Sequence, residues 1–250
     1  MKQTIKPIIT KELAEEIGIH IGDGSLGFYK KTYHYDYTIT GGLDDEMYLL
    51  DFVIPLIRKI YGLSPYIQYV KKDNSIMLKY VSKQLILWKK SIGLPIGPKN
   101  SIVIPDIIMK SNFVLDCLRG IFDTDGCILF KRRNKDVHYY PVVKLFSISR
   151  KLIKQVANIL VSEGITLSFE YDLERTCIGN RRKKIHGLYI NGEKNVEKFM
   201  EKVGFSNIKH FTKYLLWKRQ GNLEPYTTLD ERMVKLGGCS SVVERHAHIL

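Results

Sequence analysis

The sequence predicts an α+β protein of two similar lobes, each with the element order αββαββα and a four-stranded antiparallel sheet. One motif occurs twice and ends in Asp-Gly, at Asp23 and again at Asp125. The same order of hydrophobic patterns follows both copies, as expected of an internal repeat. Gly and Pro concentrate at 97–105, which indicates a linker. We expect pseudo-symmetric lobes at 8–105 and 106–220, and a tail at 221–250 that is non-essential or poorly ordered.

Each motif ends a segment that is apolar on most sides, which favours a buried helix. The first segment runs through 13–21 and the second through 113–122. Asp-Gly then ends the helix and turns the chain into a strand. Small residues four positions apart let two helix backbones approach closely. We therefore expect the two helices to pack against each other through four small residues, Gly18, Gly22, Gly120 and Thr124.

The charge at the ends of these helices is unfavourable. A carboxylate at a helix C-terminus faces the negative end of the macrodipole, which costs about 0.3–1 kcal/mol. Packed helices would also bring Asp23 and Asp125 together, and a divalent cation between them would relieve their repulsion. The alternative is that Asp-Gly is simply a favourable turn dipeptide. That alternative explains one copy better than two copies at equivalent positions.

Alternating aromatic and β-branched residues predict two hairpins in each lobe, with helices between and after them. Pro55 should bend or interrupt the long helix of the first lobe. The first lobe has strands at 25–31, 33–40, 65–70 and 75–81 and helices at 44–61 and 83–92. The second has strands at 127–132, 138–147, 166–175 and 185–191, helices at 151–163 and 193–203, and a last helix at 211–218.

Composition favours a polyanionic partner. The 250 residues include 39 Lys and Arg against 26 acids, a formal net charge of +13, which points to nucleic acid or an anionic membrane surface. No apolar run reaches the roughly 18 residues of a membrane span, and the N-terminus lacks the apolar core of a signal peptide. We expect an intracellular protein of the cytoplasm, nucleoid or organelle matrix. The four cysteines form no CxxC pair, so neither a zinc site nor a disulfide framework is indicated.

The paired motifs, Glu16-Ile-Gly-Ile-His-Ile-Gly-Asp-Gly24 and Leu118-Arg-Gly-Ile-Phe-Asp-Thr-Asp-Gly126, resemble those of single-chain LAGLIDADG homing endonucleases. The resemblance covers about residues 10–218. It implies a monomeric, metal-dependent enzyme that hydrolyses both strands of double-stranded DNA at one long, asymmetric target. That target would be roughly 20 base pairs, two adjacent segments of the major groove. The family also implies an origin in an intron or intein and cleavage that leaves short 3′ overhangs.

The resemblance assigns roles to individual residues. Asp23 and Asp125 would bind the metal, with the backbone carbonyls of Gly22 and Thr124 as further oxygens. Mg²⁺ suits oxygen-only ligation, and Mn²⁺ or Ca²⁺ could substitute in the site. Each lobe presents one lysine after its third helix, Lys99 and Lys209; in the family the equivalent lysines lie beside the scissile phosphates, where a cation polarises water or stabilises the phosphorane. The alternative for both is a phosphate-neutralising or solvated lysine.

The open face of each sheet would form half of a DNA-binding saddle. A twisted β-ribbon fits the major groove, where side chains read base edges and hairpin turns contact phosphates. For any single lysine, ordinary solubility is an equally good explanation. We expect the contacts to come from Lys30, Tyr33, Tyr35, Lys71 and Lys79 in the first lobe, and from Lys131, Arg133, Lys144, Arg175, Arg181 and Arg182 in the second.

Two other functions remain open on the same scaffold. An RNA-binding maturase that helps its own intron fold needs the basic surface but not the two acids. A non-cleaving DNA-binding regulator would usually lose one acid, and this sequence retains both. His20, inside the first motif, is expected to be a packed histidine and not a ligand.

Overall fold

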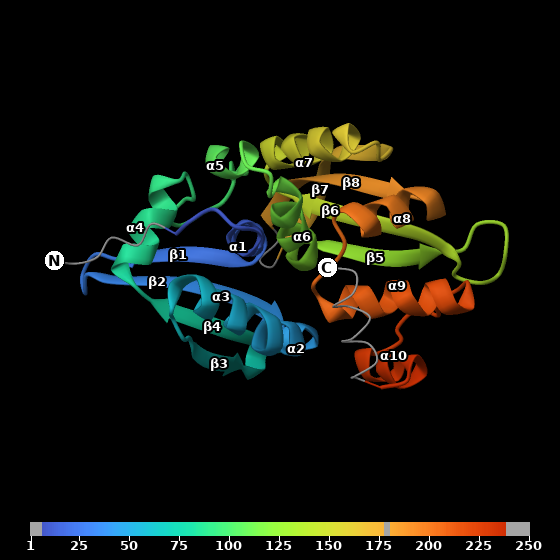
Figure 1. Ribbon diagram of the computed structural model, residues 1–250, viewed down its shortest axis with the longest axis horizontal. Coiled ribbons are helices and arrows are strands. Elements are labelled where there is room, and N and C mark those ends of the chain that lie inside the picture. The colour runs from blue at the N-terminus through green and yellow to red at the C-terminus, as the bar shows by residue number, and fades with distance from the viewer. Residues whose placement is uncertain (1–6, 178–180, 239–250) are drawn as a thin grey trace. The chain divides into compact units, whose positions relative to one another are not determined.

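The computed structural model describes residues 7–177 and 181–238, and the chain divides into two compact units that meet between Thr124 and Asp125 (Figure 1). Each unit contains one four-stranded antiparallel sheet, with strand order β1-β2-β4-β3 in the first and β5-β6-β8-β7 in the second. The α+β class and the two sheets predicted from the sequence are confirmed. No helix in the described ranges is long and apolar enough to cross a membrane.

In the first unit the strands are β1 (Gly24–Tyr29), β2 (His34–Gly42), β3 (Tyr66–Val70) and β4 (Ser75–Val81). The helices are α1 (Lys11–Gly22), α2 (Glu46–Tyr48), α3 (Ile54–Tyr61), α4 (Lys83–Ser91), α5 (Asp106–Met109) and α6 (Val114–Thr124). A five-residue π-helical segment, Leu49–Val53, separates α2 from α3. Pro55 follows this segment in the first turn of α3, where its missing N–H is tolerated, so the predicted interruption is confirmed.

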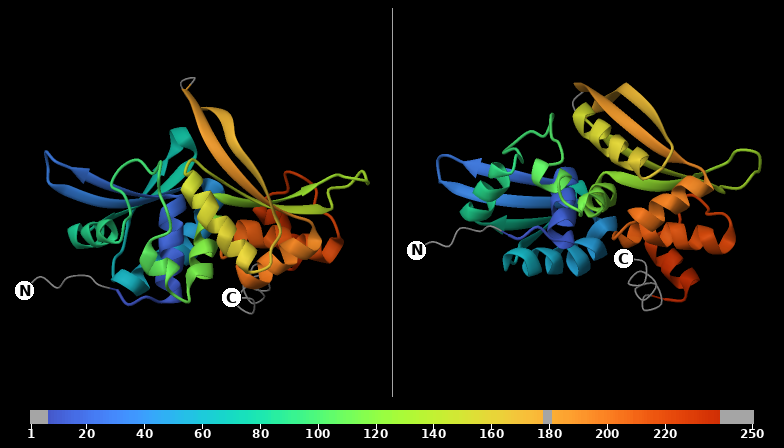
Figure 2. Two further views of the ribbon diagram at one scale, coloured as in Figure 1. Left: turned by 90° about the horizontal axis from the view of Figure 1, so that it is seen from above. Right: turned by 45° about the horizontal axis from the view of Figure 1, so that its top comes forward.

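In the second unit the strands are β5 (Gly126–Lys131), β6 (Tyr140–Ser147), β7 (Leu167–Cys177) and β8 (Arg181–Asn191). The helices are α7 (Arg150–Ser162), α8 (Glu193–Lys202), α9 (Ile208–Gln220) and α10 (Leu229–Leu236). Helix α7 lies along the β7–β8 hairpin (Figure 2). The helix α10 was not expected, and the prediction that the tail is non-essential or poorly ordered stays a prediction.

Each sheet buries one face under helices and leaves the other open. On β4, Ile76, Leu78 and Tyr80 are fully buried, whereas the alternate residues are at least partly exposed. On β5, Ile128 and Phe130 are buried while Cys127 and Leu129 are half-buried. This period of two is the pattern of a sheet with one face packed on a core.

Helix α6 belongs to the first unit because it packs along α1 (Figure 1). A Cβ on Gly18 would lie 2.0 Å from the carbonyl oxygen of Cys117, and a Cβ on Gly120 would lie 2.2 Å from that of Glu15. The two helix backbones therefore touch where each has a glycine. The lobe boundary predicted at 105/106 describes the sequence repeat and stays a prediction.

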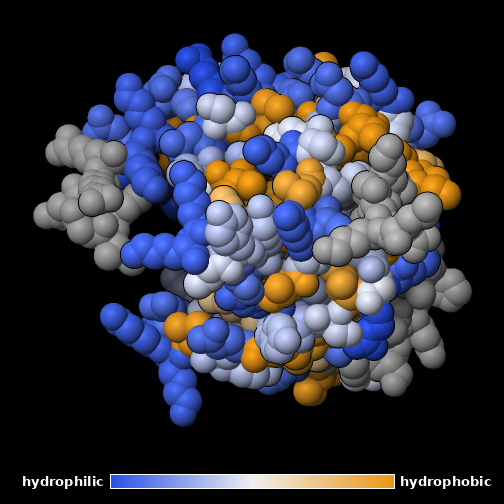
Figure 3. Space-filling view, turned by 90° about the vertical axis from the view of Figure 1, so that its left-hand side faces the viewer, coloured by the Kyte–Doolittle hydropathy of each residue, from blue (hydrophilic) through white to orange (hydrophobic). Residues whose placement is uncertain are grey.

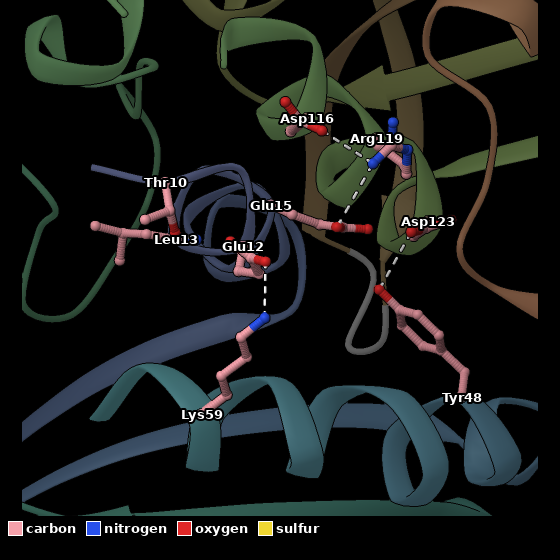
Figure 4. A network of polar contacts seen from close by, with 9 residues as sticks. All are labelled: Thr10, Glu12, Leu13, Glu15, Tyr48, Lys59, Asp116, Arg119 and Asp123. Carbon is pink, nitrogen blue, oxygen red and sulfur yellow. Dashed lines mark hydrogen bonds and ion pairs between the residues drawn. The ribbon is translucent and has the colours of Figure 1, made fainter. Parts of the chain in front are cut away.

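Charged groups also join the two helices. Arg119 of α6 lies 3.6 Å from the carboxylate of Glu15 on α1 and 3.1 Å from Asp116 on its own helix (Figure 4). Glu15 is 6% exposed, so it needs this cation. The first turn of α1 is fixed separately, by the Thr10 cap and by an exposed ion pair of 2.8 Å between Glu12 and Lys59.

A buried ion pair attaches α1 to α4. Lys89 donates to both carboxylate oxygens of Glu16, at 2.7 and 2.8 Å, and both side chains are fully buried. The ammonium also lies 4.3 Å from the ring centroid of Tyr37, a cation–π distance, and Tyr61 donates to Glu16 at 2.7 Å. Burial lowers the pKa of Lys89, and the contact with Glu16 opposes that shift. This cluster fixes the rotation of α1 beneath the first sheet.

We predict that Gly18→Ala weakens the contact between α1 and α6, because the helices must separate to accommodate the new methyl group. Overpacking of this kind costs about 1–3 kcal/mol of the free energy of unfolding, to be measured by urea denaturation. Gly42→Ala is the matched control, since its Cβ would meet nothing closer than 4.0 Å. Equal stability of the two variants would contradict close helix packing.

We predict that Lys89→Met destabilises the protein by about 3–5 kcal/mol, because it leaves the buried carboxylate of Glu16 without its cation. Lys59→Met removes the same kind of partner from the exposed Glu12 and should change the free energy of unfolding by at most about 1 kcal/mol. Denaturant titration of both variants tests the difference. A Lys89 variant as stable as the Lys59 variant would show that the buried pair does not hold α1.

Candidate functional site

Asp23 is the C-terminal cap of α1 and is half-buried. Its backbone N–H donates to the carbonyl of Ile19 at 3.0 Å, so the helix ends at this residue. At the end of α6, Thr124 donates its hydroxyl to the carbonyl of Gly120 at 2.9 Å, and the exposed Asp125 follows directly in the chain. The two predicted acids therefore each follow the last residue of a motif helix.

Acidic residues at the ends of α1 and α6 lie near the hydroxyl group of Tyr48. The Tyr48 hydroxyl donates to Asp123 at 3.3 Å (Figure 4). Burial raises the pKa of Tyr48 well above its usual value, and the charges of Asp123, Glu15 and Asp23 raise it further. Carboxylates from the ends of both helices thus act on the same phenol, so these ends lie close together within the first unit. Asp123 thus accepts a hydrogen bond from a residue 75 positions earlier in the chain.

Lys99 caps the C-terminus of α1 with its side chain. The ammonium donates to the carbonyls of Ile21, at 2.9 Å, and His20, at 3.4 Å, and also to that of Gly22. These are carbonyls that a helix end leaves without an intrahelical partner, at the negative end of the macrodipole. The structure therefore places the predicted catalytic lysine beside Asp23, on the carbonyl that the sequence assigned to the metal.

Lys209 lies in the first turn of α9, and Asn207 accepts its backbone N–H at 3.0 Å. Burial raises the pKa of the Cys127 thiol, and the charges of Lys144, Lys213 and Lys209 oppose this shift. Cys127 is two residues beyond Asp125. The second lysine thus lies near the start of β5, in the same unit as the second acid.

His20 is fully buried against Tyr37, with 5.0 Å between the ring centroids. Burial lowers its pKa well below the usual value, and the charges of Lys89 and Lys99 lower it further. The sequence predicted a packed histidine here. Within the described residues no group of three or more His, Cys, Asp or Glu side chains could hold a metal. In the first unit, the Asp23 carboxylate and the neighbouring backbone carbonyl of Gly22 are both oxygen donors, the kind of ligand that a hard divalent cation prefers.

The first sheet corrects one predicted contact. Tyr35 stacks on Phe28 at 4.6 Å and shares its side of β2 with the fully buried Tyr37. The predicted open-face position is therefore wrong for Tyr35, because Tyr37 belongs to the core and fixes the strand's orientation. Lys79 lies on the open face, 3.0 Å from Asp36. The remaining predicted residues are exposed in the hairpin turns: Lys30, Tyr33 and Lys71.

Polar side chains cover much of the face shown in Figure 3, and apolar side chains lie among them. The edge strand β3 is exposed along most of its length, with Tyr66 at 72% exposure. Tyr66 pairs with Lys79, so the open face continues across β4 to β3. The sequence did not single out Tyr66.

On the second sheet, four predicted cations lie over aromatic rings. Arg133 lies 4.0 Å from the ring centroid of Tyr140, and Lys131 lies 5.9 Å from that of Tyr189. Lys144 and Arg175 lie 5.7 and 5.3 Å from that of Phe146. The pairing of Lys144 with Tyr189 puts these aromatic residues on the face opposite the core. The sequence identified the cations and missed the rings; the side chains of Arg181 and Arg182 lie outside the described residues.

Residues 112–204 match the family model of the LAGLIDADG-like domain. Among solved structures, the chain is similar to variants of the homing endonuclease I-DmoI, with a TM-score of 0.54 and 17% identity over 77% of this chain and 95% of that one. It is also similar to the LAGLIDADG homing endonuclease I-LtrWI bound to target DNA, with a TM-score of 0.55 and 13% identity over 96% of this chain and 97% of that one. The fold is therefore that of the LAGLIDADG homing endonucleases.

Curated relatives match a segment of much longer proteins. The chain is 24% identical over 204 residues to a DNA polymerase of Thermococcus hydrothermalis, covering 80% of this chain and 11% of that protein. It is also 24% identical over 205 residues to a replication factor C small subunit of Methanocaldococcus jannaschii, covering 82% of this chain and 10% of that protein. The chain thus spans about a tenth of the length of these relatives.

Proposed function

Because the chain has the fold of the LAGLIDADG homing endonucleases and carries a LAGLIDADG-like domain, we propose that it is a site-specific, metal-dependent endonuclease that cuts both strands of a long DNA target. The observation that carries this proposal is the packing of α1 against α6, each of which is followed directly by an aspartate. A scaffold that only bound DNA would need neither acid. Retention of both favours cleavage.

In this proposal Asp23 and Asp125 bind Mg²⁺ together with the carbonyls of Gly22 and Thr124. When bound there, a divalent ion would supply an activated water and charge stabilisation at the leaving oxygen. Mn²⁺ and Ca²⁺ have the same preference for oxygen ligands, and the solved relatives include complexes with DNA and Mn and with DNA and Ca. The exposed Asp125 and half-buried Asp23 are accessible to an ion that arrives with DNA.

Lys99 and Lys209 then act on the two phosphates. Lys99 contacts the end of α1 directly before Asp23, and the charge of Lys209 acts on Cys127, two residues after Asp125, which supports one lysine for each acid. A cation held there can stabilise the additional negative charge of a pentacoordinate phosphorus. Lys99 also neutralises the end of α1, so it holds the helix end that carries Asp23.

The open faces of the two sheets would contact the DNA. The basic residues of the second unit lie over aromatic rings. Because these cation–π contacts already restrict the side chains, the side chains lose less conformational entropy on binding DNA. Lys30, Lys71 and Tyr33 in the turns would contact phosphates, and Lys79 would face the groove. The formal net charge of +13 supports an electrostatic attraction along the whole target.

The names of the curated relatives favour a mobile element. A DNA polymerase and a replication factor C subunit have different activities, yet each contains a segment like this chain. The shared segment is therefore separate from the activity that either name describes. An endonuclease encoded in an intron or intein, which cuts DNA so that the element is copied into new genes, would occur within unrelated proteins in this way.

We predict that the purified protein cuts a small set of sequences in a pooled DNA library with Mg²⁺, and that EDTA abolishes cutting. Asp23→Asn or Asp125→Asn should reduce the cleavage rate by about 100-fold or more, because the metal contributes several kcal/mol to the transition state. Sequencing of the cut ends gives the target. The control is Asp51→Asn, an exposed acid on the helical layer, which should cut normally. Target binding without cleavage by the wild-type protein would instead identify a regulator.

We also predict a steep dependence of binding on salt. A protein that contacts 6–10 phosphates loses about 10³- to 10⁵-fold in affinity between 50 and 200 mM salt. Lys131→Met or Arg175→Met should each reduce the slope of log K against log[salt] by about 0.9, measured by fluorescence anisotropy with the Asp23→Asn protein. Lys154→Met, on the exposed side of α7, should leave the slope unchanged. Equal slopes in all variants would remove the second sheet from the DNA interface.

A further inference from the structure

The segment after the sequence repeat forms a capped, docked helix. Helix α10 begins with a capping box in which Thr228 and Glu231 satisfy each other's backbone N–H groups, and it ends at Gly237 in the left-handed conformation. Met233 and Leu236 are 7% and 2% exposed, since α10 packs against α9. Helix α10 is therefore an ordered part of the second unit, with capped ends and a packed apolar side.

The most buried charge of this helix contacts the first turns of α9. Arg232 is 2% exposed. Its Nε donates to the hydroxyl oxygen of Thr212 at 3.0 Å, one terminal nitrogen donates to the carbonyl of Lys209 at 3.3 Å, and the other donates to the carbonyl of Thr227. A guanidinium on a peripheral helix would normally stay in water, so its burial is costly unless its donors are used. Here they are used on the Thr212 hydroxyl and on the carbonyls of Lys209 and Thr227.

Lys209 is thereby held at both ends of its backbone. Its N–H is bonded to Asn207, and its carbonyl accepts from Arg232. Thr212 extends the contact, because its hydroxyl donates to the carbonyl of Ile208 at 2.8 Å while it accepts from Arg232. Of residues 203–212, only Lys209 is not fully buried. The backbone of this turn is held in place by hydrogen bonds, and the Lys209 side chain is the accessible one.

We propose that Arg232 is a positioning residue for Lys209, and that α10 is required for efficient cleavage of the one DNA strand that Lys209 serves. This inference rests on the proposed endonuclease function. The other lysine, Lys99, is held differently, through contacts of its own ammonium with the end of α1. Loss of Arg232 should therefore affect one strand and leave the other nearly unchanged.

The test measures single-turnover cleavage of each strand of an end-labelled target by the full chain. Arg232→Met should slow one strand about 10- to 100-fold, since a displacement of about 1 Å at a catalytic group can cost 100-fold. The other strand should stay within about twofold, so nicked DNA accumulates while the Kd for DNA is unchanged. Lys209→Met should slow the same strand, and the double variant should be no slower than Lys209→Met alone.

Met233→Ala is the matched control, because it removes a buried contact of α10 without touching Lys209. It should lower stability and leave the ratio of strand rates as in the wild type. Arg232→Lys keeps the buried charge and should restore part of the rate. Should Arg232→Met not fold, Thr212→Val removes one acceptor of Arg232 and keeps the contact of Arg232 with the carbonyl of Lys209, so it should show the same strand bias in weaker form.

Three results would overturn the inference: equal slowing of both strands, slowing of the strand that Lys209→Met leaves intact, or additive effects of the two substitutions. Amide hydrogen exchange provides a readout that does not depend on cleavage. Exchange at residues 208–212 should accelerate in Arg232→Met and not in Met233→Ala. If the wild-type protein cuts no DNA, the proposed function fails, and this exchange experiment still decides whether Arg232 holds the turn.

Discussion

The contact between α1 and α6 is the constraint on which the rest of the structure depends. Two helix backbones approach closely only where neither carries a side chain, and Gly18 and Gly120 provide that space. The contact joins the second motif helix to the unit that contains the first. It also brings the ends of both helices to Tyr48. Without it, Asp123 and Asp23 would not both act on the same phenol.

Close packing creates an electrostatic problem that polar contacts resolve. The ends of both helices are negative, and carboxylates lie at or next to them. Lys99 donates to the end of α1, Thr124 bonds the last carbonyls of α6, and Tyr48 donates to Asp123. Further along α1, Arg119 and Lys89 neutralise buried glutamates. Within the first unit, each of these buried negative groups therefore has a hydrogen-bond donor or a cation beside it.

Sequence reasoning predicted the parts of the fold that depend on local periodicity. The strands and helices lie within a few residues of their predicted ranges, and Pro55 interrupts the long helix as expected. Features that depend on contacts between residues far apart in the chain could not be predicted from the sequence. The face of Tyr35 depends on which alternate tyrosine enters the core, and the Glu16–Lys89 pair joins residues 73 positions apart. The rings beneath Lys131 and Arg133 could have been found by applying strand alternation to Tyr140 and Tyr189.

Helix α10 was not predicted from the sequence because its segment lies outside the repeat. A repeat identifies what two lobes share, so it says nothing of an element present in one of them. Thr228 and Glu231 have the spacing of a capping box, a local signal for a helix start that the tail's glycines obscured. Once α10 docks, the two candidate lysines differ in support although their lobes match in topology. Lys99 is held through its ammonium and Lys209 through its backbone, so the matching topology of the two units does not give these two lysines the same support.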